Sequence, residues 1–231
     1  MKKDHSHIYK DKSLKNWPHR QRLKEIKSVI EKEGSRSHGT LTYADVGCGT
    51  GFLTKVVANQ LKPEEVYGFD HSEHLEVARK KNPSFKFEFM ELNNPADVGQ
   101  HDFVTCFETI EHVGNPDSAL SNLIKMTKSG GTLLLTAPIE IGPVGLVKFL
   151  AKTIVYNYKL DELSGNGANL YNKYLLALIS YKDISKFRDQ RFGWGTHFGF
   201  DYRRVDDLLR SKKIKYRTKN VVTTRFYIVK P

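Results

Sequence analysis

Three alternating glycines that follow an acidic residue are the clearest chemical feature of this chain. Asp45 is followed by Gly47, Gly49 and Gly51 in the run ADVGCGTG. Because glycine lacks a Cβ, a ligand can approach the backbone of such a turn, and a helix that begins after the turn directs its free N–H groups at that ligand. The spacing matches neither the P-loop nor the dinucleotide fingerprint, and the carboxylate of Asp45 would repel a pyrophosphate. We therefore expect a nucleotide-like cofactor that carries an ammonium group.

A second acidic residue, Asp70, ends the apolar run VYGFD that follows the glycines along the chain. A carboxylate at the end of a second strand can accept hydrogen bonds from both hydroxyls of an adenosine ribose. Ser72 then stands where a side chain could cap the start of the next helix. These positions predict that the cofactor includes a nucleoside.

Short apolar runs alternate with helix-like segments along most of the chain, and these elements would position the candidate residues. The apolar runs predict strands at residues 42–46, 66–70, 85–89, 102–107, 132–137, 213–218 and 224–229. The periodic segments predict helices at 52–61, 72–81, 116–128 and 204–211, the third of them ended by Ser129-Gly130-Gly131. Such alternation implies an α/β fold with a doubly wound, mostly parallel sheet, whose ligand lies at the carboxyl ends of the strands.

The glycine motif resembles the first motif, D/E-x-G-x-G-x-G, of the class I S-adenosylmethionine-dependent methyltransferases. Asp45, Gly47, Gly49 and Gly51 match it position by position, and the segment ETIEHV at 108–113 resembles a subfamily that includes the ubiquinone-pathway O-methyltransferases. The resemblance implies a Rossmann-like methyltransferase fold with a seven-stranded sheet and a helical insert after the fifth strand. It also implies S-adenosylmethionine as the cofactor.

The same resemblance implies a role for each candidate cofactor residue. The glycine loop, with Asp45, would hold the methionine end, and Asp70 would hold the ribose. Glu91 and Leu92 follow the third strand and would lie on the adenine side. Phe107, at the end of the fourth strand, would line the methionine moiety and the methyl-transfer site.

Two histidines are candidates for the general base. His112 lies after the fourth strand, and His197 precedes an aromatic helix start near residue 200. Methyl transfer to oxygen needs a base near the acceptor hydroxyl, and an unperturbed histidine titrates near neutral pH. Glu108, Glu111 and the two histidines could instead bind a divalent ion, as in the small-RNA 3′-terminal 2′-O-methyltransferases that the segment also resembles. We expect a site without a metal.

The composition predicts one domain over residues 1–231 and a reducing, cytoplasmic location. The two cysteines, Cys48 and Cys106, lie in core-like positions and form no disulfide framework. The N-terminus lacks the apolar stretch of a signal peptide, and no run is long enough to span a bilayer. The formal net charge is +11, and part of it lies in a basic N-terminal helical segment at 1–36. This charge suits either a solvated surface or an anionic partner, without a specific nucleic-acid signature.

Residues 139–196 exceed what a methyltransferase core requires. Two apolar helices are predicted there, at 146–156 and 171–181, and Lys148 and Lys152 interrupt the first of them. The insert could form a lid, a dimer surface or an element at a membrane interface. We favour a lid over the acceptor.

Together these patterns favour an S-adenosylmethionine-dependent methyltransferase that acts on an oxygen of a small or lipid-like acceptor, which could be anionic. Two alternatives stay open, namely a metal-assisted RNA ribose 2′-O-methyltransferase and a catalytically silent relative that binds the cofactor. The sequence identifies neither the acceptor nor the oligomeric state.

Overall fold

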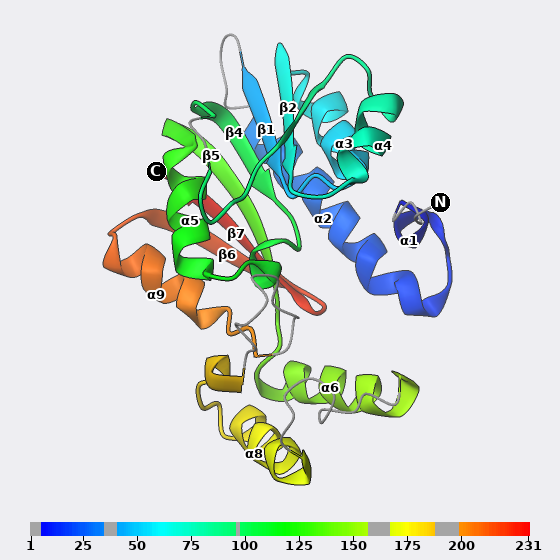
Figure 1. Ribbon diagram of the computed structural model, residues 1–231, viewed down its shortest axis with the longest axis vertical. Helices are drawn as coiled ribbons and strands as arrows, with labels where there is room; N and C mark the ends of the chain where they lie inside the picture. Colours follow the sequence, from blue (N-terminus) through cyan, green and yellow to red (C-terminus); the bar gives the residue numbers. More distant parts are fainter. Residues whose placement is uncertain (1–5, 35–40, 96–97, 157–166, 188–198) are drawn as a thin grey trace.

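The computed structural model describes residues 6–34, 41–95, 98–156, 167–187 and 199–231 (Figure 1). The strands are β1 (Thr42–Val46), β2 (Glu65–Asp70), β3 (Lys86–Phe89), β4 (His101–Cys106), β5 (Thr127–Pro138), β6 (Lys215–Val221) and β7 (Thr224–Lys230). The α-helices are α1 (His7–Lys10), α2 (Trp17–Gly34), α3 (Phe52–Leu61), α4 (His74–Lys81), α5 (Pro116–Lys125), α6 (Gly142–Tyr156), α8 (Gly167–Ile179) and α9 (Arg203–Ser211). Short 3-10 turns lie at η1 (Leu14–Asn16), η2 (Ile110–His112) and η3 (Ser185–Phe187).

The strands join one seven-stranded sheet in the order β3-β2-β1-β4-β5-β7-β6. Strands β1 to β5 run parallel, whereas β7 pairs antiparallel with both β5 and β6. This confirms the predicted α/β fold with a doubly wound, mostly parallel sheet. The strand order reverses between β1 and β4, and a crevice is expected at the carboxyl ends of these two strands because the chain leaves them in opposite directions.

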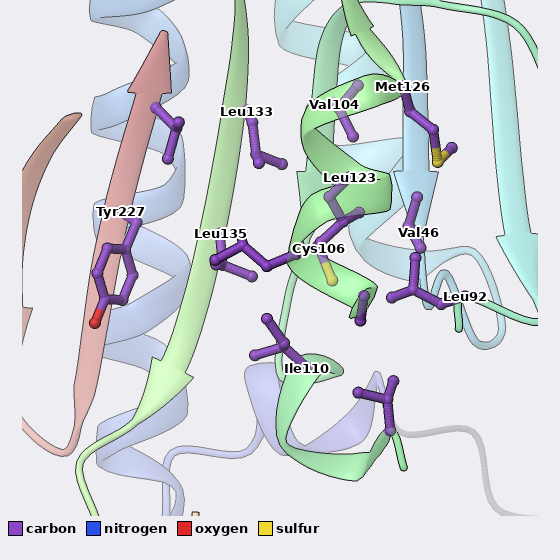
Figure 2. Close-up of a cluster of buried hydrophobic side chains, with 14 of the residues drawn as sticks. Val46, Leu92, Val104, Cys106, Ile110, Leu123, Met126, Leu133, Leu135 and Tyr227 are labelled. Atoms are coloured by element: carbon purple, nitrogen blue, oxygen red, sulfur yellow. The ribbon is translucent and has the colours of Figure 1, made fainter. Parts of the chain in front are cut away.

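Helices cover both faces of the sheet, which explains why the central parallel strands β1 and β4 are buried along most of their length. The basic helix predicted near the N-terminus is α2, and it packs with α3 and α4 on one face, where Ile26, Tyr43 and Phe103 are buried. Helices α5 and α9 cover the other face (Figure 1). Figure 2 shows this second core, in which Leu123 of α5 joins Cys106 and the strand β5 side chains.

The predicted cap of α4 is wrong. The N–H of Ser72 donates to Asp70 Oδ1 at 2.9 Å, and the helix begins only at His74. The carboxylate of Asp70 thus holds the chain in a turn for two residues after the strand, because an aspartate readily accepts the N–H two positions ahead. The N-cap position of α4 is therefore Glu73, one residue after Ser72, and no side chain caps the helix.

The predicted C-terminal end of the helix at 116–128, which is α5, is also wrong. Helix α5 stops at Lys125 rather than near 128, because Thr127 already pairs with His101 of β4. Residues 129–131 lie inside β5, where Gly130 has a φ of 78°. The register between β4 and β5 shifts at this place. The glycines therefore form an irregular part of a strand and do not cap a helix.

The helical insert predicted after the fifth strand is present as α6 and α8, which lie apart from the sheet layers in Figure 1. The two helices share a small core of their own, in which the ring centroids of Phe149 and Tyr174 lie 5.2 Å apart. The lid role of 139–196 stays a prediction, since parts of that range lie outside the described residues. Among the helices that are described, none combines the length and the hydropathy needed to cross a bilayer.

Candidate active site

The glycine turn between β1 and α3 adopts a backbone that suits glycine alone. Gly47, Gly49 and Gly51 have φ values of 77°, 52° and 75°, in the left-handed region that side chains with a Cβ disfavour. A Cβ on Gly47 would lie 2.0 Å from Thr109 Oγ1, so this glycine lets the turn pack against the segment after β4. A Cβ on Gly49 would meet no atom within 4 Å. Gly49 therefore presents bare backbone to open space.

Asp70, at the end of β2, holds this turn in place. Its Oδ2 accepts the N–H of Gly49 at 2.8 Å. Gly51, by contrast, packs toward α4, because a Cβ on it would lie 2.8 Å from Asn82 Nδ2 and 3.1 Å from the ring of Phe87. The three glycines thus have different structural tasks, and Asp70 lies beside the one that faces open space.

Asp45 is the buried charge of the site. Its side chain is 2% exposed and accepts hydrogen bonds from the hydroxyl groups of Thr54 at 2.6 Å and Thr105 at 2.7 Å. Burial raises the pKa of Asp45 to about 6, although both hydroxyl donors oppose this shift. Near neutral pH the carboxylate is ionised in a poorly solvated place, and a cationic ligand group would stabilise it there.

A cavity of about 410 Å³ lies at this turn, and its volume is within the range of ligand-binding pockets. Asp45, Gly47 and Gly49 line it together with Phe107 and His112 from the segment after β4. Five of the residues predicted to form the site therefore meet in one place. This is the crevice expected from the reversal of strand order between β1 and β4.

The N-terminal segment forms part of the cavity wall, which the sequence did not predict. Tyr9 lines it and stacks on Phe52 with ring centroids 5.4 Å apart. Arg22 lines it as well, is 5% exposed, and places Nη2 2.8 Å from Glu108 Oε2. Its Nε donates to Thr224 Oγ1 at 3.2 Å. These contacts of the largely buried Arg22 fix the first half of α2 against the carboxyl end of β4 and the amino end of β7.

The sequence position of Arg22 indicates that its side chain is buried. This arginine lies four residues before Ile26 and seven before Val29, so it belongs to the apolar face of α2. A charged side chain on the buried face of a helix needs a partner inside the protein. The charge pattern alone predicts only a solvated or anion-binding helix. No comparable signal marked Tyr9, because its place depends on how α1 docks.

Glu108 and His112 reach the cavity through an unusual backbone. Glu108 has a φ of 49°, which is strained for a residue with a side chain, and its N–H donates to Thr136 Oγ1 at 3.0 Å. The 3-10 turn η2 that follows brings His112 to the cavity. Glu111 is fully buried, and this burial, with the charge of Glu108, raises its pKa well above the usual value. Strain of this kind is common at functional sites.

The described residues contain no group of three or more His, Cys, Asp or Glu side chains that could hold a metal ion. His197, the second candidate base and the fourth candidate ligand, lies outside the described residues. Metal independence and the role of His197 therefore stay predictions.

The remaining predicted residues lie away from the cavity walls. Glu91 is exposed just after β3, and Leu92 belongs to the hydrophobic core on the α5 side of the sheet. Their expected roles on the adenine side stay predictions. Asp70 contacts the turn without lining the cavity itself.

The sheet order, the antiparallel β7 and the glycine turn with its buried acid define a class I S-adenosylmethionine-dependent methyltransferase. A family model described as "Methyltransferase domain" matches residues 17–141, and the chain belongs to this family. S-adenosylmethionine is the cofactor of this class. The site fits it, since Gly49 leaves room for a ligand at the backbone and Asp45 is a carboxylate in the cavity wall that could pair with an ammonium group.

Known proteins resemble parts of the chain. It is 29% identical over 113 residues to putative methyltransferase 235L of Invertebrate iridescent virus 6, a match that covers 48% of this chain and 43% of the viral protein. It is 38% identical over 94 residues to the ubiquinone biosynthesis O-methyltransferase of Shewanella pealeana, with 38% and 39% covered. The matched region thus spans about two fifths of the length of these curated relatives.

Solved structures resemble the whole fold. Magnesium protoporphyrin IX methyltransferase from Synechocystis PCC 6803, solved with bound SAH, has a TM-score of 0.62 at 18% identity. The alignment covers 98% of this chain and 92% of that protein. At this identity the likeness concerns the fold.

The raised pKa of Asp45 predicts a pH-dependent affinity for the cofactor. Below about pH 6 the carboxylate is protonated and offers less attraction to an ammonium group. The affinity for S-adenosylhomocysteine should therefore rise with pH up to about 6, by up to about tenfold per unit, and then level off. Isothermal titration calorimetry between pH 5 and 8, at roughly half-unit steps, measures this.

Two controls isolate Asp45 in this measurement. Asp45→Asn should flatten the pH profile for S-adenosylhomocysteine. The ligand 5′-methylthioadenosine lacks the amino-acid end and should give a flat profile with the unaltered protein. Equal pH dependence for both ligands would show that Asp45 does not face the ammonium group.

Proposed function

We propose that this protein transfers the methyl group of S-adenosylmethionine to a hydroxyl oxygen of a small or lipid-like acceptor. The observation that carries the proposal is His112, whose side chain lines the same cavity as the glycine turn. An imidazole there can accept the proton that a hydroxyl loses when its oxygen is methylated. The similarity to ubiquinone biosynthesis O-methyltransferases supports oxygen as the methylated atom.

Within this proposal the charged groups of the cavity assign the methionine end. The ammonium group lies toward Asp45, and the carboxylate lies toward the guanidinium of Arg22, which is a cation that lines the cavity. Phe107 packs against the aliphatic part of the methionine end of the cofactor. Asp70 accepts hydrogen bonds from the ribose hydroxyl groups. Glu91 and Leu92 lie on the adenine side of the cofactor.

The bound cofactor supplies a methyl group on a positively charged sulfur, which a nearby oxygen can attack directly. The protein then has to align the acceptor, exclude water and remove one proton. The stacked rings of Tyr9 and Phe52 shield the cavity from solvent. His112 removes the proton, and the insert at 139–196 covers the acceptor. No covalent intermediate with the protein is needed, so Cys48 and Cys106 play no part in the reaction.

Methyl transfer from radiolabelled S-adenosylmethionine to a set of phenols, catechols and long-chain alcohols tests the proposal. Mass spectrometry of the products should show one methyl group on oxygen. A matched set of amines and a mixture of RNA oligonucleotides serve as competitors. Label on RNA ribose, or on nitrogen alone, would replace this function by another one.

Asp70 provides a separate prediction for cofactor binding. Asp70→Asn should weaken S-adenosylhomocysteine binding by about 1–3 kcal/mol, the cost of an unmade hydrogen bond to a charged group. Glu65→Gln is a matched control, because Glu65 begins the same strand at its opposite end. Calorimetry that gives both variants the same affinity as the unaltered protein would remove Asp70 from the cofactor site.

A further inference from the structure

Exposed apolar side chains gather on the helical insert. We call six of them the α6–α8 apolar face, and they are Val144, Val147, Leu150, Leu176, Ile179 and Tyr181. They make up six of the nine large apolar side chains that are exposed among the described residues. Val147 is 67% exposed and Leu176 is 65% exposed. Such a concentration of apolar surface in one part of a protein marks an interaction site.

These side chains are not the unfilled side of a poorly packed core. The inner sides of α6 and α8 already enclose Phe149, Tyr174 and Leu178, which are 5% exposed or less. On α6 the outer residues recur every three positions, at 144, 147 and 150, and so form a stripe along the helix. Among the described residues, both helices thus contribute buried side chains to a shared core and also carry apolar side chains that are exposed.

Lysines on and just after α8 lie beside the Leu176 end of this face. A shallow depression of about 460 Å³ has Leu176, Ala177 and Phe187 as its apolar lining. Lys173, Lys182 and Lys186 line it as well, and no acidic side chain does so among the described residues. Apolar side chains between lysines suit a surface that is apolar inside and negatively charged outside.

We propose that the α6–α8 pair docks on a lipid bilayer that contains anionic phospholipids. Val147, Leu176 and Ile179 enter the boundary between headgroups and acyl chains, and the three lysines bind phosphate groups at the level of the headgroups. A second copy of this chain fits less well, because a two-fold interface through the same surface would bring identical lysines together. The proposal goes beyond the methyl transfer proposed above and does not depend on the acceptor or the cofactor.

Vesicle flotation tests this proposal on the full chain without cofactor or acceptor. The unaltered protein should float with vesicles of phosphatidylcholine and phosphatidylglycerol but not with phosphatidylcholine alone, and high salt should release it. The variant Leu176→Ser/Ile179→Ser removes apolar contact, and Lys173→Glu/Lys182→Glu removes charge attraction. The lysine variant should lower the vesicle partition constant by at least about tenfold, because one lysine near an anionic surface alone strengthens binding about fivefold. The serine variant should lower it by at least about tenfold as well, because two large apolar side chains no longer leave water.

A matched control keeps the net charge constant. Lys80→Glu/Lys212→Glu changes two exposed lysines on α4 and just after α9, and this variant should float like the unaltered protein. Circular dichroism and thermal unfolding establish that all the variants fold, which is expected because each altered side chain is exposed.

Three results would overturn the proposal. The first is no flotation of the unaltered protein with anionic vesicles. The second is equal loss in the control variant, which would indicate attraction by net charge alone. The third is a dimer, seen by sedimentation, that only Leu176→Ser/Ile179→Ser dissociates while vesicle binding is absent. None of them bears on methyl transfer, which is measured separately in solution.

Discussion

Replacement of His112 by alanine should lower kcat for methyl transfer by about 10²–10⁴, the usual contribution of a positioned general base. His112 lies at the end of η2 and lines the cavity beside the glycine turn. The affinity for S-adenosylhomocysteine should stay within about twofold of that of the unaltered protein, since the cofactor contacts other groups. Steady-state kinetics and calorimetry on the same preparation separate the two quantities.

A purely structural role for His112 would give a different pattern. If the imidazole acts as a base, added free imidazole should partly restore kcat in His112→Ala, because a small base can enter the space that the side chain leaves. His7→Ala is the control, since His7 is exposed on α1 and does not line the cavity. Retained turnover in His112→Ala would shift the role of base to His197 or Glu108.

The second large effect concerns Gly49. In Gly49→Ala the new Cβ meets no protein atom within 4 Å, so the protein should fold with a loss of about 1–2 kcal/mol from the left-handed backbone. In the proposed site this Cβ would point to where the cofactor approaches the turn, so affinity for S-adenosylhomocysteine should fall by about 10²-fold, as expected for an overpacked contact. Calorimetry and thermal unfolding measure the two effects.

Two other glycines serve as comparisons. Gly130 has a φ of 78° and open space around a Cβ, so Gly130→Ala should show the backbone cost without a loss of cofactor affinity. Gly47→Ala should destabilise the fold by roughly 2–5 kcal/mol, because its Cβ would lie 2.0 Å from Thr109 Oγ1. If Gly49→Ala bound the cofactor normally, the cofactor would have to lie elsewhere in the cavity.

Local sequence patterns predicted the bounds of helices and strands well where a segment fitted only one type of secondary structure. The helix at 52–61 and the strand at 42–46 have the predicted bounds, because glycine turns and buried apolar runs limit the alternatives there. The helix predicted to 128 ends at 125 because a pairing with β4, distant in sequence, begins at Thr127. Pairing between strands outweighs local helix preference, and a single sequence does not display it.

The site shows the same division. The types and spacing of Asp45, Gly47 and Gly49 determined the class of cofactor, since the chemistry of a strand, a glycine turn and a helix is local. The pairing of Arg22 with Glu108 was decided only by the tertiary structure, which brings α2 against the end of β4 across 86 residues of chain. The task of each glycine was decided there too, because a missing Cβ has meaning only when its neighbours are known. The conformation of a glycine turn depends on consecutive residues, so the sequence predicts it. The partners of a buried side chain depend on how helices and strands distant in sequence pack together, so only the tertiary structure shows them.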